Sequence, residues 1–180
     1  MLRSGASAAV GSFNVTGYAT SVAATIQNPN VYNRYERTYK NWWTNNGAQV
    51  KFYNYWDASQ TTNLQIMENM VHKSIVKTVY DPCPVGFHIP CIVTFKGFSA
   101  SNGGTWDNGY TWDNNFFQAA GCRYYMSGLV TQVGSYGYYW TAASFDATYA
   151  YLLSFHSDTV YYTSSLSRAN SYSVRPVARS

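Results

Sequence analysis

The sequence predicts a single α+β domain in which strands dominate over helices. With 180 residues, 46% of them hydrophobic, the chain is long enough and apolar enough to bury one core. Its last third carries short aromatic and aliphatic runs at intervals typical of β-hairpins. Only two segments, residues 62–73 and 93–98, are expected to form short helices.

The distribution of charged and apolar residues argues against nucleic-acid binding and against membrane insertion. Charged residues make up 11% of the chain, and its 12 Lys and Arg residues are scattered rather than clustered. Nucleic-acid binding is not expected, because it needs basic side chains gathered on one surface. Membrane insertion is not expected either, because no apolar stretch approaches the roughly 18 residues that span a bilayer.

The first half of the chain divides into an extension and the start of the domain. Residues 1–25 are small, polar and nearly uncharged, which predicts an N-terminal extension or linker strand, and the domain is assigned to residues 26–180. Aromatic residues crowd residues 31–57 without a regular period, which favours a buried cluster under irregular backbone. Residues 62–73 carry a helical apolar stripe, and residues 75–80 are expected to form a strand that the following prolines end.

The second half is predicted to consist of short strands and turns. Candidate strands are residues 116–117, 137–140, 151–155, 159–162 and 172–175. The sequence TWDN occurs at residues 105–108 and again at 111–114, which indicates polar turns more than a calcium site. Within 151–156, alternation predicts that Tyr151, Leu153 and Phe155 face the core. It also predicts that Leu152, Ser154 and His156 face outward.

No catalytic, metal or cofactor site is expected. The eight acidic residues do not pair, the three histidines lie in unrelated contexts, and no nucleophile, phosphate-binding or zinc motif is present. Cys83 and His88 could form a nucleophile pair, but a tight turn between Pro82 and Pro84 is the preferred interpretation of Cys83. Together with Cys91 and Cys122, these thiols lack zinc spacing. The chain is therefore not expected to be an enzyme.

The last 40 residues have an unusual composition. They contain no Trp, Met, Lys, Gln or Glu, whereas residues 1–140 contain 23 of these five types. No codon that ends in C or T encodes any of the five, so a segment built from such codons would have this composition. What remains is rich in Tyr, Ser and Thr, as in antibody paratopes. An ordinary exposed sheet is the alternative, but it explains the missing Lys, Gln and Glu less easily.

Several ordered blocks resemble fimbrillin-like surface proteins of gut bacteria. They are KTVYDPCPVGFHIP at residues 77–90, AGCRY at 120–124, VGSYGYYW at 133–140 and RANSYSVRPV at 168–177. The similarity covers about residues 26–178, with Ser171 standing where the family has Gly. It implies a C-type-lectin-like fold and, at about residues 141–171, a variable segment diversified by a retroelement that mutates adenines.

The resemblance also divides the variable segment into scaffold and binding positions. It implies scaffold roles for Trp140, Tyr151, Leu153, Phe155, Val160, Arg168 and Arg175. It implies a ligand-binding face made of Ser144, Phe145, Asp146, Ala147, Thr148, Tyr149, Leu152, Ser154, His156, Asp158, Thr159, Tyr161, Tyr162, Thr163, Ser164, Ser165, Leu166 and Ser167. Among these, Phe145, Tyr149, Tyr161 and Tyr162 are expected to be exposed aromatic anchors.

The expected function is ligand binding by an adhesin or receptor-binding domain at a cell or virion surface. Expected partners are a protein or glycan on a target cell and other subunits of a pilus tip or phage tail fibre. Calcium-dependent sugar binding is not expected, because the EPN, QPD and WND motifs of such lectins are absent. A structural pilin or fibre subunit without its own ligand is the alternative, with residues 1–25 as a donor strand.

Overall fold

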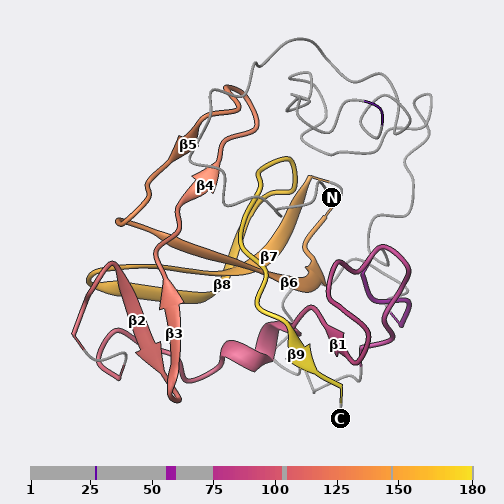
Figure 1. Ribbon diagram of the computed structural model, residues 1–180, viewed down its shortest axis with the longest axis horizontal. Helices are drawn as coiled ribbons and strands as arrows, with labels where there is room; N and C mark the ends of the chain where they lie inside the picture. The colour runs from indigo at the N-terminus through magenta and orange to yellow at the C-terminus, as the bar shows by residue number, and fades with distance from the viewer. Residues whose placement is uncertain (1–26, 28–55, 60–74, 103–104, 147, 180) are drawn as a thin grey trace.

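The described part of the molecule consists of short antiparallel strands around one three-stranded sheet (Figure 1). A computed structural model describes residues 27, 56–59, 75–102, 105–146 and 148–179. Its elements are β1 (Phe87–His88), η2 (Ile92–Phe95), β2 (Gly109–Trp112), β3 (Asn115–Gln118), β4 (Cys122–Arg123), β5 (Val130–Thr131), β6 (Gly137–Ser144), β7 (Tyr149–His156), β8 (Thr159–Ser167) and β9 (Val177–Ala178). The sheets have the orders β1-β9, β2-β3, β4-β5 and β6-β7-β8.

The predicted α+β class, with a C-type-lectin-like fold and one or two short helices, is wrong for these residues. Apart from the helical residue Gln27, the described ranges contain only the four-residue 3-10 helix η2. This helix stops where the predicted one at residues 93–98 would continue, because Lys96 is extended and Gly97 has a φ of +96°. The other predictions for residues 1–25, most of 31–57 and 62–73 lie outside the described residues.

Strand β7 is the centre of the fold and is buried on both of its faces. One face contributes Leu153 and Phe155 to a mainly aromatic cluster with Phe98, Tyr110 and Phe117. The opposite face contributes Ala150 and Leu152 to a second cluster, which contains Cys122, Tyr138 and Trp140. The sheet is thus the middle layer of the core rather than one wall of it.

Four of the predicted strands lie inside observed strands and two do not. Residues 116–117, 137–140, 151–155 and 159–162 fall within β3, β6, β7 and β8. In the predicted strand 75–80, Lys77 alone forms a β-bridge, to Asp57. In the predicted strand 172–175, Ser173 alone forms one, to Tyr139. Both segments have strand-like composition, but each pairs with another part of the chain at one position only.

The polar turn predicted at the second TWDN sequence is the tip of the β2–β3 hairpin. Trp112 pairs with Asn115, so Asp113 and Asn114 form a two-residue loop. Both have positive φ values, 48° and 57°, as a type I′ turn requires. Asn and Asp tolerate this conformation better than most residues, which explains their presence at the tip.

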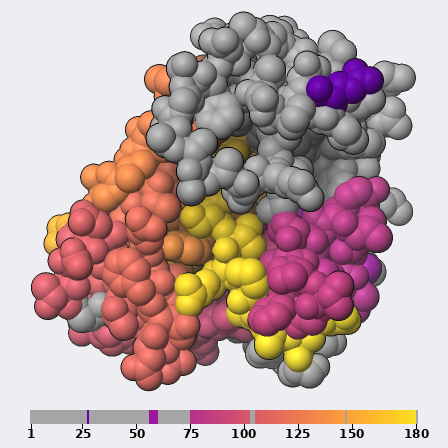
Figure 2. All heavy atoms as spheres, viewed as in Figure 1, coloured from indigo at the N-terminus to yellow at the C-terminus, as the bar shows by residue number. Residues whose placement is uncertain are grey.

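The C-terminal segment runs along the outer edge of β6 and covers part of the sheet. The Trp140 amide donates to the Ser173 carbonyl at 2.9 Å, and the Ser173 amide donates to the Tyr138 carbonyl at 3.0 Å. In Figure 2 this yellow segment lies in the middle of the visible face, next to the magenta residues that precede η2. One edge of the sheet is therefore closed by the chain itself.

Two buried hydroxyl groups in β6 give a matched test of this packing. Thr141 is fully buried, and its Oγ1 donates to the Tyr151 carbonyl at 2.8 Å. Ser144 is buried, but its Oγ has no hydrogen-bond partner in the described structure. We expect Thr141→Val to lower the free energy of unfolding by about 1 kcal/mol. Ser144→Ala should leave it unchanged or raise it by up to about 1 kcal/mol, because it removes an unpaired buried group.

Urea unfolding of both variants beside the parent chain measures these changes. A loss of stability in Ser144→Ala equal to that in Thr141→Val would show that the Ser144 hydroxyl has a partner after all.

Candidate binding face

A row of three directly paired side chains crosses the central sheet near the β7–β8 turn. Tyr138 of β6 pairs with Ser154 of β7, and Ser154 pairs with Tyr161 of β8. Directly opposite residues lie on the same face of a sheet, so the three side chains form one continuous row. Tyr138 and Ser154 are buried, whereas Tyr161 is 57% exposed. The row therefore runs from the core to the surface.

Two more rings extend this row. Tyr136 stacks on Tyr138 with 5.8 Å between ring centroids and 5° between ring planes. The same ring lies 5.2 Å from the imidazole of His156, which is half-buried at the end of β7. We call Tyr136, Tyr138, Ser154, His156 and Tyr161 the tyrosine face. Because its rings support one another, an incoming ligand would meet a preorganised surface.

The opposite end of the same sheet face is covered by the rest of the chain. The Tyr172 ring lies 4.7 Å from that of Trp140 and 4.9 Å from that of Tyr138. Trp56 also contacts Trp140 edge-on, at 6.1 Å. Beyond Tyr138 this cover ends, and Tyr161 and His156 reach solvent. The limit of the C-terminal cover thus defines the tyrosine face.

The phenols at the inner side of the face are neutral hydrogen-bonding groups. Burial raises the pKa of Tyr138 to about 12, although its hydroxyl donates to Gln132 Oε1 at 3.0 Å. Burial also raises the pKa of Tyr172, whose oxygen accepts a hydrogen bond from Asn170 Nδ2 at 2.6 Å. Such a surface offers stacking and hydrogen bonds rather than charge, which suits reversible recognition.

The structure brings only part of the predicted binding face together. Ser154, His156, Thr159 and Tyr161 lie on or beside the tyrosine face, and Ser164 follows on the same side of β8, paired with Leu152. The other predicted residues lie in the core, in the β6–β7 loop, in the β7–β8 turn or elsewhere along β8. They are Ser144, Phe145, Asp146, Thr148, Tyr149, Leu152, Asp158, Tyr162, Thr163, Ser165, Leu166 and Ser167. Ala147 lies outside the described residues.

The expected outward position is wrong for four of these residues. Leu152 is fully buried, and Ser144, Ser154 and Ser167 are each at least 90% buried. The alternation in β7 is real, but both of its faces are core, because the C-terminal segment covers the side that the pattern assigned to solvent. Alternation of side chains along a strand identifies its two faces, but it does not show that either face is exposed to solvent.

Two of the four expected aromatic anchors also have structural roles. The Phe145 ring packs edge-on against Tyr151 at 5.4 Å. Tyr162 is half-buried and packs against the cluster that contains Leu153 and Phe155. Tyr149 is half-buried beside the β6–β7 loop, which leaves Tyr161 as the exposed anchor.

The β6–β7 loop is held by its own polar groups. Asp146 Oδ1 accepts hydrogen bonds from the Thr148 and Tyr149 amides, each at 2.6 Å. Arg168, an expected scaffold residue, donates from Nε to the Tyr149 carbonyl at 3.1 Å. Substitution of Asp146 would release two amides, so this position is a turn-forming one.

The remaining expected scaffold residues occupy structural positions. Trp140, Tyr151, Leu153 and Phe155 are buried, and Val160 packs beside Phe155. Arg175 ties the C-terminal segment to the β2–β3 hairpin. It donates from Nη2 to Asn115 Oδ1 at 2.7 Å, and its guanidinium lies 5.1 Å from the centroid of the Phe117 ring.

Sequence reasoning missed Tyr136 and Tyr138 as members of the face. The available signal was the same alternation used for β7: in residues 137–140, Tyr138 and Trp140 share one face and Tyr139 takes the other. This stretch precedes the segment of unusual composition, and the sequence predicts a strand there with a scaffold role for Trp140 alone.

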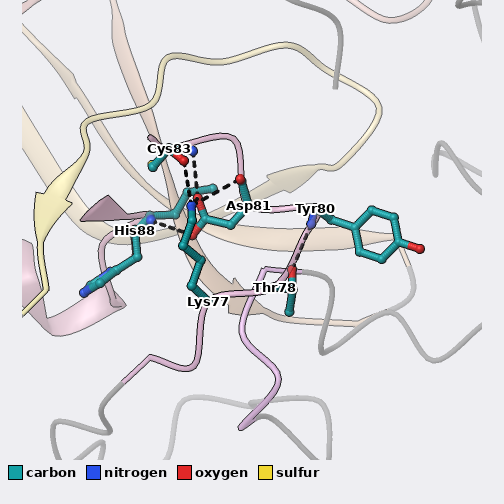
Figure 3. Close-up of polar contacts among 7 residues, drawn as sticks. Lys77, Thr78, Tyr80, Asp81, Cys83 and His88 are labelled. Atoms are coloured by element: carbon teal, nitrogen blue, oxygen red, sulfur yellow. Dashed lines mark hydrogen bonds and ion pairs between the residues drawn. The ribbon is translucent and has the colours of Figure 1, made fainter. Parts of the chain in front are cut away.

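The Cys83–His88 pair considered as a nucleophile is not assembled. Figure 3 shows the His88 ring directed away from Cys83, and His88 Nδ1 lies 2.7 Å from the Ile89 carbonyl oxygen. Burial and the nearby Asp81 carboxylate raise the pKa of Cys83 to about 12, so the thiol stays protonated. A thiol without a base and with a raised pKa is a poor nucleophile.

Asp81 organises this turn. Its carboxylate is buried and accepts hydrogen bonds from Lys77 Nζ and the Cys83 amide at 2.8 Å, and from the Ile89 amide at 3.0 Å (Figure 3). Burial opposes ionisation, but these donors outweigh it, so the pKa of Asp81 lies below its ordinary value. Lys77 Nζ also donates to the Cys83 carbonyl at 2.7 Å. The site is a structural node that fixes residues 77–89.

The described residues contain neither a metal-binding cluster nor a membrane-spanning helix. No three His, Cys, Asp or Glu side chains within the described ranges lie close enough together to hold a metal ion. No helix in these ranges is both long and apolar enough to cross a bilayer.

The chain matches no protein-family model, no curated protein and no solved structure. These comparisons therefore assign neither a family nor a known fold to it.

The titrating groups of the core predict how stability depends on pH. The pKa of Cys83 is raised from 9.0 to about 12 in the folded state, so between these values the unfolded chain binds fewer protons than the native one. Stability should fall as pH rises above about 9, by about 1 kcal/mol per pH unit for this thiol. Below about pH 4 it should fall again, because the pKa of Asp81 is lowered on folding.

Urea unfolding from pH 3 to 11 measures both limbs. Cys83→Ala should make the alkaline limb shallower and keep most of the acid limb, because Lys77 and the backbone amides of residues 83 and 89 still lower the pKa of Asp81. An alkaline limb as steep in Cys83→Ala as in the parent chain would assign that limb to other groups.

Proposed function

We propose that the chain is the ligand-binding domain of a surface-displayed adhesin or receptor-binding protein, and that it binds through the tyrosine face. The observation that carries the proposal is the exposed Tyr161 ring at the end of a row of paired side chains that begins in the core. An aromatic ring held by a rigid sheet loses little conformational freedom on binding, which is why such rings dominate many recognition surfaces.

The residues around Tyr161 support the same role. Thr159 and Ser164 are half-buried and carry hydroxyl groups on the same strand, and His156 adds a ring that both donates and accepts hydrogen bonds. Small hydroxyl side chains adapt their hydrogen bonds to different ligands while the aromatic ring supplies contact area. The ligand is proposed to be a protein or glycan on a target cell.

Diversification is the second part of the proposal. The absence of Trp, Met, Lys, Gln and Glu from the last 40 residues, and the resemblance to fimbrillin-like proteins, support a variable segment at about residues 141–171. Within it, the surface positions of β8 can vary without loss of the core, whereas Leu152 and Ser167 are enclosed. Display on a pilus tip or a tail fibre, beside other subunits, fits this use.

A structural pilin or fibre subunit without its own ligand is the second candidate. It is favoured by exposed apolar side chains far from the tyrosine face in sequence: Val79 is 92% exposed and Val85 is 96% exposed. Exposed apolar side chains release water when another chain covers them, which suits a subunit contact. The two candidates differ in whether the isolated chain binds a target through Tyr161.

Substitution of Tyr161 tests the binding face. The chain is screened on a glycan array and on an array of cell-surface proteins, and each positive target is then titrated with variants. Tyr161→Ala should weaken binding at least about tenfold, because an exposed aromatic anchor is removed, and shift the melting temperature by only about 3 °C. Tyr162→Ala should lower the melting temperature more, because its ring packs on the core.

Tyr80→Ala serves as the control, since Tyr80 is similarly exposed, at 63%, outside the tyrosine face. Equal binding by the Tyr161→Ala variant and the parent chain, or unfolding of that variant, would disprove this assignment of the face. Absence of any target on both arrays would favour the structural subunit.

The coding DNA and its flanks test diversification. We expect a nearby, almost identical copy of codons 141–171 that differs mainly where it carries adenines. Sequencing of the flanking DNA provides the comparison. A flank without such a copy would remove the retroelement from the proposal and leave the tyrosine face as an ordinary, invariant surface.

A further inference from the structure

The two outer edges of the central sheet, those of β6 and β8, differ in their backbone hydrogen bonds. The outer edge of β6 is closed by backbone hydrogen bonds to Ser173 and, through the Ala142 amide, to the Pro90 carbonyl at 2.8 Å. The outer edge of β8 has no such cover: between Thr159 and Leu166, the described residues supply no backbone hydrogen bond from the side opposite β7. Among the described residues, one edge of the sheet is therefore paired and the other is not.

The pairing register shows which backbone groups point outward from β8. His156 pairs with Thr159 across a two-residue turn, so these two residues exchange both of their hydrogen bonds. The next residue, Val160, therefore directs its N–H and C=O away from β7. Further along the sheet, the backbone groups of odd-numbered β7 residues, including Tyr151, are directed toward β6 and not toward β8. Ser165, which pairs with Tyr151, therefore also directs its backbone N–H and C=O away from β7.

The sequence of β8 lacks most features that protect an edge strand. From Thr159 to Ser167 it contains no charged residue and no proline. A register shift lies between the pairs made by Tyr161 and Ser164, and it divides the edge into two short stretches. Charges occur just outside the strand, with Asp158 before it and Arg168 after it. The edge is thus neutral along its length and oppositely charged at its ends.

We propose that β8 pairs antiparallel with β8 of a second copy of this chain. A two-fold axis perpendicular to the sheet places the stretch around Val160 beside the stretch around Ser165 of the partner subunit, with the two bulges at the centre. The same arrangement brings Asp158 toward Arg168 of the partner subunit, whereas parallel pairing would bring like charges together. The edge is self-complementary in hydrogen bonding and in charge.

The pairing has a consequence for recognition, which rests on the proposed function. A two-fold axis perpendicular to the sheet keeps both tyrosine faces on the same side of one six-stranded sheet. A dimer would then present two Tyr161 rings toward one target surface. Two linked sites bind a multivalent surface far more tightly than one site does.

The contact between two edge strands is small, so a weak dimer is expected. Interfaces that bury less than about 1,200 Å² belong to transient complexes. Sedimentation velocity of the full chain from about 10 μM to 1 mM should show a monomer–dimer equilibrium. Ser165→Pro should raise the dissociation constant at least about tenfold, because it removes an outward N–H. Ser165→Ala, the matched control, should leave it within about twofold.

Thermal unfolding shows whether the Ser165→Pro variant is folded, as expected for proline at an outward edge position. Asp158→Lys provides a second test, since it reverses an exposed charge outside the strand and should also raise the dissociation constant. A chain that stays monomeric at 1 mM would overturn the proposal, as would a dimer that neither Ser165→Pro nor Asp158→Lys weakens. Loss of target binding by Tyr161→Ala without any change in dimerisation would separate this interface from the binding face.

Discussion

Burial of β7 on both faces is the constraint on which the described fold depends. Leu153 and Phe155 pack into one cluster and Leu152 into another, so the strand cannot move without disturbing both. The packing around β7 is so close that one position of the neighbouring strand β6 has room only for glycine. A side chain at Gly137, which pairs with Phe155, would overlap the Phe155 ring. The sheet therefore serves as the rigid support of everything displayed on it.

The C-terminal segment decides where that support becomes accessible. Tyr172 covers Trp140 and Tyr138, and the surface opens only past Tyr138, toward His156 and Tyr161. The same segment pairs with the outer edge of β6, whereas no described residue pairs with the outer edge of β8 between Thr159 and Leu166. The proposed recognition and the proposed self-association therefore use different parts of one sheet: a face for the ligand and an edge for a second copy.

Local sequence pattern predicted the elements that depend on local chemistry. The strands around Tyr139, Leu153 and Tyr161 and the turn at Asp113 follow from alternation and turn propensity. The exposure of Leu152 could not be predicted, because it depends on a segment some twenty residues away that covers it. Segments 75–80 and 172–175 have the composition of strands, but pairing is a tertiary property, and each finds only one bridge. Burial also depends on tertiary structure, so residues predicted to form one binding face lie in the core, in loops and at the surface.

The pairing of β1 with β9 joins residues 87–88 to residues 177–178, and Arg123 pairs with Ser171 over about half that separation. These contacts join distant parts of the chain, whereas the other described sheets pair strands that follow one another in sequence. Contacts of this long range form slowly, because a large loop must close before they can form. During synthesis, the backbone hydrogen bonds that join Ser173 to Tyr138 and Trp140 cannot form until residue 173 has left the ribosome.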